Sequence, residues 1–122
     1  MTICYDLRFP NLYQDLALSG AEIIVVPSAF SNLTGPAHWH TLLRARAIET
    51  GSFIIAPAQT GNHQCGRVSY GHSLIVSPWG KVLKDAKRKV GIIHTEIKLE
   101  EVRKVRNSIP SLNSKRNYST NF

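Results

Sequence analysis

The sequence predicts an α/β fold with parallel strands, and three features of its 122 residues support this prediction. Two continuous apolar runs, Ala21 to Val26 and Phe53 to Pro57, have the pattern of strands buried on both faces. A segment with apolar residues at helical spacing precedes each run. Because buried strands here alternate with helices, we expect parallel pairing through helical crossovers.

The first half of the chain supplies this alternation. Met1 to Cys4 has the character of the last residues of a strand, and Asp6 to Pro10 of the turn that leaves it. The apolar repeat from Leu12 to Ala17 predicts a short helix, with Gly20 where a left-handed cap belongs. A second helix is predicted from Pro36 to Gly51, because proline suits the first helical turn and glycine stops the last.

The second half is predicted to contain shorter strands and a final helix. The segment Gly61 to Gly66 is expected to be a turn-rich connection, and Pro78 to Gly80 a tight reversal. A last helix covers Leu99 to Arg106, and the tail beyond Pro110 is expected to be irregular. Strands are predicted at Tyr70 to Val76, Lys81 to Leu83 and Val90 to Ile97. We therefore expect one domain over residues 1–112 and a polar basic tail over residues 113–122.

Composition favours a folded protein outside the membrane. The hydrophobic fraction is 43% and the charged fraction 19%, and the most apolar runs are too short to span a bilayer. The two cysteines, Cys4 and Cys65, are too few for a disulfide framework and suit a reducing compartment. We expect a cytoplasmic protein that does not bind membranes.

The net charge of +7 is confined to the carboxy-terminal third. Residues 1–80 hold four basic and four acidic side chains, whereas residues 81–122 hold eleven basic and four acidic ones. The basic residues are scattered, with no aromatic residues between them and no recognisable nucleic-acid-binding module. A solvated basic face is therefore expected, and nucleic acid is an unlikely partner.

Cys4 is the main candidate for chemistry. A cysteine where a buried strand turns into a helix places its sulfur at the mouth of an α/β sheet, and the next backbone amide, that of Tyr5, is free to face a bound carbonyl oxygen. A small buried hydrophobe is the alternative that base rates favour for a lone cysteine. The surrounding sequence has to decide between the two.

Four polar residues near the cysteine motif are expected to have structural roles. Asp6 and Arg8 lie in the turn after Cys4, where hydrogen bonds and charge pairing would brace the loop. Arg46 and Glu49 lie three residues apart on the second helix, where a local ion pair is expected. Glu49 is thus not a candidate general base.

Substrate contacts are proposed for Phe30 and Trp39, which flank the loop after the first parallel strand. Pockets in open α/β sheets form at such loops. Core packing is an equally good interpretation of these two aromatic residues.

No metal or other cofactor is expected. His38 and His40 lie two residues apart on a predicted helix, so their side chains point in nearly opposite directions. His63 and Cys65 could share one side of a loop, but two ligands do not make a zinc site.

The sequence around Cys4 resembles the nucleophile motif of the nitrilase superfamily. The resemblance extends in order to about residue 112 and is greatest for the amidase branch that hydrolyses deaminated glutathione. After Leu112 the tail departs from that branch. The matching segments are Ile3-Cys4-Tyr5-Asp6-Leu7-Arg8-Phe9-Pro10, Ala21-Glu22-Ile23-Ile24, Pro27-Ser28-Ala29-Phe30, Gly35-Pro36-Ala37-His38-Trp39, Leu43-Arg44-Ala45-Arg46-Ala47-Ile48-Glu49, Tyr70-Gly71-His72-Ser73 and Pro78-Trp79-Gly80.

The resemblance implies a four-layered α-β-β-α sandwich and a cysteine–lysine–glutamate triad. Of this triad only the cysteine, Cys4, is expected here, because the family's glutamate and lysine precede the cysteine motif. We accordingly expect a carboxy-terminal half, truncated at its amino terminus.

The implied reaction is hydrolysis of a small carboxylate-bearing amide to acid and ammonia through a thioester on Cys4. The chain alone is expected to be nearly inactive and to need a separately encoded amino-terminal half, while the complete enzyme is expected to form a homo-oligomer. A non-catalytic remnant and a basic binding module remain as alternatives.

Overall fold

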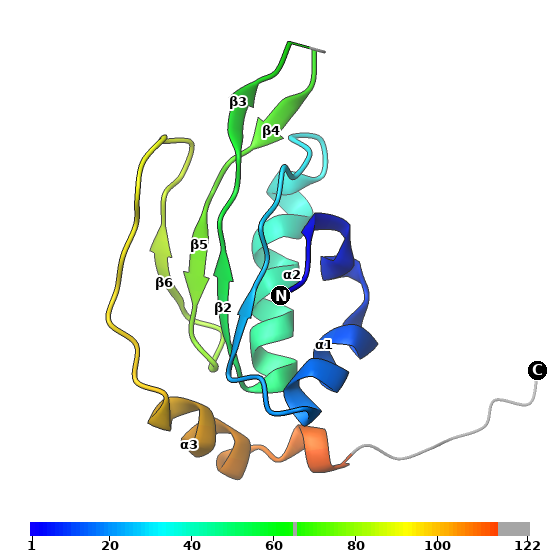
Figure 1. The fold of residues 1–122 in the computed structure, drawn as a ribbon, viewed down its shortest axis with the longest axis vertical. Coiled ribbons are helices and arrows are strands. Elements are labelled where there is room, and N and C mark those ends of the chain that lie inside the picture. The colour runs from blue at the N-terminus through cyan, green and yellow to red at the C-terminus, as the bar shows by residue number, and fades with distance from the viewer. Residues whose placement is uncertain (65, 115–122) are drawn as a thin grey trace, which may run out of the picture.

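The computed structural model describes residues 1–64 and 66–114, and its helices and strands alternate along the chain as an α/β protein (Figure 1). The helices are η1 (Cys4–Arg8, 3-10), α1 (Pro10–Leu18), α2 (Gly35–Thr50), α3 (Glu100–Ser108) and η2 (Ser111–Ser114, 3-10). The strands are β1 (Ile23–Val25), β2 (Phe53–Ala56), β3 (Thr60–Asn62), β4 (Val68–Tyr70), β5 (Leu74–Val76) and β6 (Val82–Asp85).

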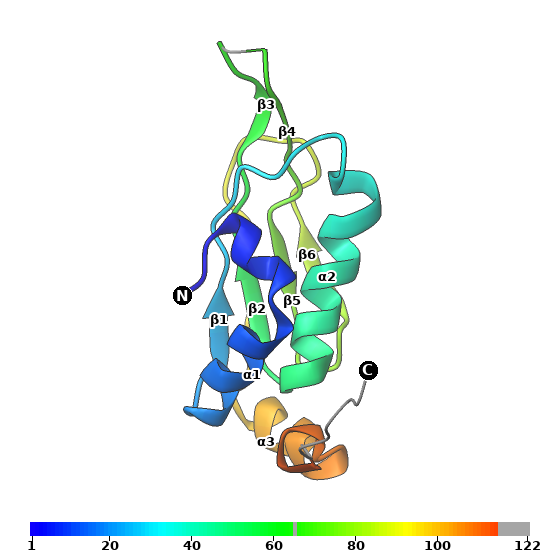
Figure 2. The ribbon, with the colours of Figure 1, turned by 90° about the vertical axis from the view of Figure 1, so that its right-hand side faces the viewer.

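The main sheet has the order β1-β2-β5-β6, and β3 pairs with β4 in a separate hairpin. Strands β1 and β2 are parallel, as expected for two strands joined through α2, whereas β5 and β6 add to the sheet antiparallel. Helices α1 and α2 lie on one face of the sheet (Figure 2). The segment over residues 86–98 passes along the side away from these helices (Figure 1).

The core lies between the two helices and the sheet. Strand residues that point toward the helices meet apolar residues of α1 and α2, as the alternation of side chains along a strand requires. These buried residues are Tyr13, Trp39, Leu43, Ala47, Ile24, Ile54, Ala56, Leu74 and Val76. At the start of α2, Gly35 leaves room for Tyr70, because a Cβ on residue 35 would lie 2.6 Å from the Tyr70 Cβ.

The segment before Cys4 runs beside β1, although it does not form the predicted strand. The Thr2 amide donates to the Val25 carbonyl and the Cys4 amide to the Pro27 carbonyl, each over 3.0 Å. In a parallel ladder the return bond to the Thr2 carbonyl would come from the amide of residue 27. Residue 27 is proline and has no N–H, so only one side of the ladder forms.

Three predictions for the second half were wrong. The turn-rich segment after residue 60 contributes β3 to a hairpin with β4, and the predicted strand from Tyr70 to Val76 is broken by Gly71 and His72, whose φ angles are +80° and +58°. No described strand pairs with residues 90–97, where Val90 and Ile92 are over 90% exposed. Apolar alternation alone cannot make a strand without a backbone partner.

Helix α3 lies below the sheet and is attached to it through Arg106. The guanidinium donates to the carbonyls of Thr50 and Ala21 and to the Ser52 hydroxyl, over 2.6 to 3.1 Å. Gly51, with φ +57°, ends α2 directly under the Arg106 side chain. Burial lowers the pKa of Arg106.

Past α3, the chain continues into η2, where an irregular tail was predicted. The rest of the predicted basic tail, residues 115–122, lies outside the described residues. Within residues 1–64 and 66–114, no helix combines the length and the hydropathy that crossing a membrane would require.

Candidate functional site

Cys4 occupies a strained position where an extended segment turns into a helix. Its φ angle is +45°, in the left-handed region that residues with a Cβ rarely adopt, and it is the first residue of η1. Its thiol is free and the residue is half-buried. Left-handed non-glycine residues cluster at functional sites, and a sharp strand-to-helix turn is the geometry that exposes a nucleophile above an α/β sheet.

A cavity of about 690 Å³, widely open to solvent, lies beside Cys4, and its volume is within the size range of small-molecule sites. Its floor is formed by Pro27–Ala29 and Pro57–Gln59, which directly follow the parallel strands β1 and β2. A parallel bridge between Ser28 and Ala58 holds these two segments side by side. The cavity therefore sits at the carboxyl ends of parallel strands, where ligands bind in open α/β sheets.

The backbone amide of Tyr5 has no protein acceptor among the described residues. This agrees with its place as the second residue of a 3-10 helix, where the first N–H groups have no preceding carbonyl to bind. The Tyr5 side chain is exposed and packs against Phe9, with ring centroids 5.8 Å apart. The amide is thus available as a donor, and its role as an oxyanion donor stays a prediction.

Asp6 and Arg8 hold the turn that follows Cys4. The Asp6 carboxylate accepts a hydrogen bond from the Ile3 amide over 2.9 Å, which closes the turn across Cys4. Arg8 donates to His38 Nδ1 over 3.2 Å, and its guanidinium lies over the rings of Tyr5 and Phe30 at 5.5 and 5.4 Å. These contacts are those of structural support.

Arg46 attaches the cysteine-bearing turn to α2. It is buried, its Nε donates to the Leu7 carbonyl over 3.0 Å, and its Nη1 donates to Glu49 over 2.8 Å. The guanidinium also lies 5.6 Å from the centre of the Tyr13 ring. A helix that comes much later in the sequence thereby fixes the position of η1.

Phe30 and Trp39, the two residues proposed for substrate contact, are packed together in the core. Their ring centroids are 4.9 Å apart, and Trp39 has no exposed surface. The indole N–H donates to the His72 carbonyl over 2.7 Å. Neither residue lines the cavity beside Cys4, so their arrangement fits the alternative of core packing.

Sequence reasoning missed several residues that the fold brings to the cavity. Ser28 and Gln59 line it and lie in the loops that leave the two parallel strands, so the rule that sites form at strand ends could have found them. Arg67 comes from the β3–β4 hairpin, and no local signal pointed to it. Of the described residues around the cavity, Arg67 alone is charged, and none is a carboxylate, histidine or lysine.

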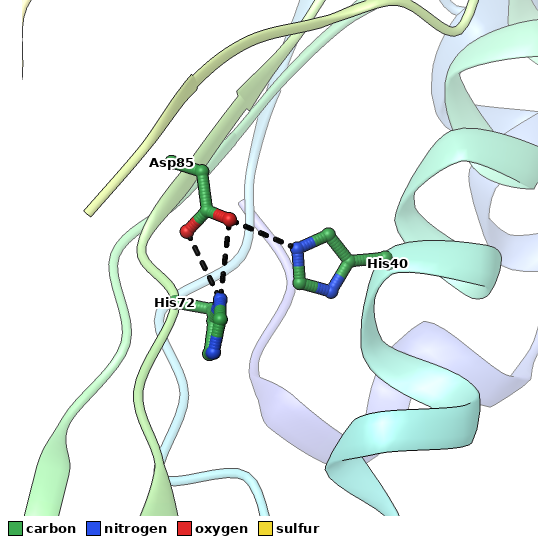
Figure 3. A group of neighbouring side chains, drawn as sticks. All are labelled: His40, His72 and Asp85. Atoms are coloured by element: carbon green, nitrogen blue, oxygen red, sulfur yellow. Dashed lines mark hydrogen bonds and ion pairs between the residues drawn. The ribbon is translucent and has the colours of Figure 1, made fainter. Parts of the chain in front are cut away.

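A second polar cluster, unforeseen from the sequence, joins α2 to β6 (Figure 3). His40 Nε2 lies 3.3 Å from the Asp85 carboxylate and His72 Nδ1 lies 3.0 Å from it, and the three ligand-type atoms are within 4.8 Å of one another. Lys87 donates to the same carboxylate from its amine over 2.8 Å and from its amide over 2.7 Å. Because Asp85 already has these four donors, we interpret the cluster as a tie between secondary-structure elements.

Donors to Asp85 also set its protonation. Burial alone would raise the pKa of Asp85, but the hydrogen bonds from the Lys87 side chain and amide, then from His72 and His40, outweigh burial. The pKa is held well below its ordinary value of 3.8, so the carboxylate is ionised at neutral pH.

The fold and the strained cysteine turn define the class of protein: an α/β protein with nucleophile-type turn geometry above the ends of parallel strands. The pattern of the family described as Carbon-nitrogen hydrolase matches residues 1–107. The chain therefore belongs to the carbon-nitrogen hydrolase family.

Curated relatives agree with this assignment and with the resemblance to the deaminated glutathione amidase branch. The chain is 48% identical over 112 residues to the deaminated glutathione amidase of Synechocystis sp., covering 92% of this chain and 41% of that protein. It is 50% identical over 117 residues to the enzyme of that name from Dictyostelium discoideum, covering 95% and 40%. The chain thus spans about two fifths of the length of these relatives.

Solved structures confirm the nitrilase-type fold. The NitFhit protein of C. elegans superposes with a TM-score of 0.91 at 46% identity, covering 95% of this chain and 28% of that one. Nit3 of Saccharomyces cerevisiae, a member of branch 10 of the nitrilase superfamily, superposes with a TM-score of 0.83 at 39% identity, covering 88% and 40%.

Proposed function

We propose that this chain carries the nucleophile of an amidase and that Cys4 is the reacting group. The observation behind the proposal is the left-handed backbone of Cys4, held above a cavity at the ends of two parallel strands. Such strain persists only where the surrounding structure enforces it, here through the Asp6 carboxylate that binds the Ile3 amide and through Arg46, which binds the Leu7 carbonyl. A cysteine that merely filled space would not require this backbone conformation.

The proposed reaction is acyl transfer. The Cys4 thiolate attacks the amide carbon, a carbon–sulfur bond forms, and the carbonyl oxygen becomes an oxyanion facing the Tyr5 amide. Collapse of this intermediate breaks the carbon–nitrogen bond, and the nitrogen leaves as ammonia after taking up a proton. Water then attacks the thioester, which releases the acid and returns the thiol.

The reaction needs a general base within hydrogen-bonding reach of the sulfur or of the attacking water. Among the described residues that line the cavity, Arg67 is the only ionisable group besides Cys4 itself, and a guanidinium does not give up its proton at neutral pH. We therefore propose that a segment of the family type, amino-terminal to these residues, supplies the glutamate base and the lysine. A small amide that also bears a carboxylate is the proposed substrate.

Complementation tests the proposal and makes the first prediction. Ammonia release from a primary α-keto amide is measured for this chain alone, and for a fusion that joins the amino-terminal portion of the Dictyostelium discoideum relative to this chain. We expect release to be near background for the chain alone and at least about 100-fold faster for the fusion, because general acid–base catalysis alone contributes about 10² to 10⁴.

Cys4→Ala in the same fusion is the matched control, and it should return ammonia release to background. Mass spectrometry of the quenched fusion should detect the acyl group on the Cys4 peptide. Enzyme-like release by the chain alone would show that these residues contain a base of their own. An inactive but folded fusion would favour a non-catalytic protein.

A further inference from the structure

Arg67 is the one charged side chain among the described residues that line the cavity beside Cys4. The rest of the lining is apolar or uncharged, including Ser28, Gln59 and Ser73. Arg67 is exposed, and its guanidinium forms no ion pair or side-chain hydrogen bond with any described residue. An unpaired arginine facing a small-molecule cavity presents a fixed fork of donors that matches a carboxylate.

The hairpin that carries Arg67 is fastened to the loop after β1. The Asn32 amide donates to the Val68 carbonyl over 3.0 Å, and the Tyr70 amide donates to the Phe30 carbonyl over 2.8 Å. Within the hairpin, the His63 amide donates to the carbonyl of Arg67 itself over 2.8 Å. The backbone at Arg67 and directly after it is therefore anchored, and the exposed side chain is the part left to meet a ligand.

Other cations near the site are occupied or lie elsewhere. Arg8 binds His38 and packs against two aromatic rings, and it does not line the cavity. Lys89 lines an adjoining hollow of about 300 Å³ and not the cavity itself. Arg67 is thus the cation that a ligand in the Cys4 cavity meets.

We propose that Arg67 binds the carboxylate of the substrate and so selects anionic amides over neutral ones. This inference rests on the proposed function and adds to it the group that recognises the substrate class. The substrate is then an amide whose reacting carbonyl reaches Cys4 while a carboxylate on the same molecule reaches the hairpin. Gln59, which lines the same cavity, offers a further amide donor to a bound ligand.

Alkylation of Cys4 tests the inference without any hydrolysis. Iodoacetate and iodoacetamide react alike, since the thiolate forms a carbon–sulfur bond and iodide leaves, but only iodoacetate carries a carboxylate. The second-order rate constants for Cys4 are measured with each reagent by peptide mapping, which separates Cys4 from Cys65. The quantity compared is the ratio of the iodoacetate rate constant to the iodoacetamide rate constant.

Arg67→Gln should lower this ratio about fivefold, the size expected when one unit charge near a reacting anion is removed at high dielectric. Arg67→Lys keeps the charge and should retain most of the ratio. Arg103→Gln removes the same charge at an exposed position of α3, a helix that contributes no residue to the cavity lining, and should leave the ratio unchanged. At about 1 M salt the difference between the parent and Arg67→Gln should shrink, because the Debye length is then about 3 Å.

An equal ratio in Arg67→Gln and Arg103→Gln, with Cys4 still alkylated by both reagents, would overturn the role of Arg67 and leave Cys4 as the nucleophile. If neither reagent modifies Cys4 in the folded protein, the proposed nucleophile fails and the inference fails with it. The two failures are therefore distinct.

Discussion

Arg46 is the residue on which the geometry of the cysteine turn depends. Replacing it with methionine leaves the buried Leu7 carbonyl without its donor and removes the Glu49 ion pair. We expect the free energy of unfolding to fall by about 2 kcal/mol, as for other hydrogen bonds to charged groups. Urea denaturation measures the change, and Arg103→Met, at an exposed position, should stay within about 0.5 kcal/mol of the parent. Equal losses in both variants would show that Arg46 is not a brace.

The ionisation of Asp85 makes the free energy of unfolding depend on pH in the acid range. Because its pKa in the folded protein lies below the ordinary value of 3.8, the folded state favours the ionised carboxylate. The resulting stabilisation is fully present above about pH 4 and is lost as the pH falls toward the folded pKa. Asp85→Asn should therefore cost stability at pH 7, and the gap between variant and parent should narrow below pH 4.

Urea denaturation of both proteins at several pH values measures this gap. The titration of carboxylates outside this cluster is common to both proteins, so the difference in stability reports Asp85 together with the donors that contact it, His40, His72 and Lys87. A gap that is the same at pH 3 and pH 7 would contradict the role given to the donors around Asp85.

At the scale of the elements, Arg106 makes the side-chain hydrogen bonds that join α3 to the end of α2 and to the sheet, while Val102 is the buried apolar residue of the same helix. Arg106→Leu removes the donors to Thr50, Ala21 and Ser52. We expect amide hydrogen exchange to accelerate at least about tenfold within residues 100–108 while α2 keeps its protection, because a local unit can open without global unfolding. Arg103→Leu, on the exposed side of the same helix, is the control for helix propensity. A uniform loss of protection across the sheet would instead show that Arg106 stabilises the whole fold and not α3 alone.

The long helices could be predicted because their signals are local. Pro10 and Pro36 mark first turns, Gly20 and Gly51 have the left-handed φ expected after a last turn, and each observed helix lies within two residues of its predicted bounds. The hairpin β3–β4 could not be predicted, since glycine and asparagine in β3 have little strand propensity. Its two strands pair with each other, and backbone bonds also join β4 to the loop after β1, which is distant in the sequence.

The residues of the candidate site also fall into two groups, those that local sequence signals predicted and those that they did not. The position of Cys4 followed from the motif around it, and the strand ends that form the cavity floor followed from parallel topology. Arg67 and the cluster around Asp85 depend on tertiary packing that brings separate elements together. Pro27 is a residue whose effect could have been read from the sequence, because it has no N–H to donate and so prevents a full strand from forming before Cys4.

For the whole molecule, the charge distribution predicts weak and unselective binding to nucleic acid. The excess of basic residues after residue 80 comes from Lys81, the segment over residues 86–98, α3 and residues 115–116 of the sequence. Fluorescence anisotropy with two unrelated duplexes should show similar weak affinities that fall steeply between about 50 and 200 mM salt. Tight binding that prefers one sequence at physiological salt would favour the basic binding module over the hydrolase.

Exposed apolar surface predicts that the isolated chain associates with itself. Ile3, Val90 and Ile92 are more than half exposed, and β1 ends the sheet with only the partial ladder of residues 2–4 beside it. We expect size-exclusion chromatography to show concentration-dependent species larger than 13.6 kDa, together with binding of a hydrophobic dye. The fusion with the amino-terminal portion of the Dictyostelium discoideum relative should reduce both the self-association and the dye binding. A compact monomer that binds no dye would contradict this expectation.

The anchoring of η1 by Arg46 has a consequence for how a complementing segment would work. The conformational entropy of the cysteine turn is lost when this chain folds, because Arg46, which anchors the turn, lies on α2 of the same chain. A docking partner would then meet a preorganised thiol. The free energy of docking would not be reduced by the cost of ordering that group. Even a weakly docking partner can therefore produce a reactive geometry, which makes this chain a rigid support for testing substituted catalytic segments.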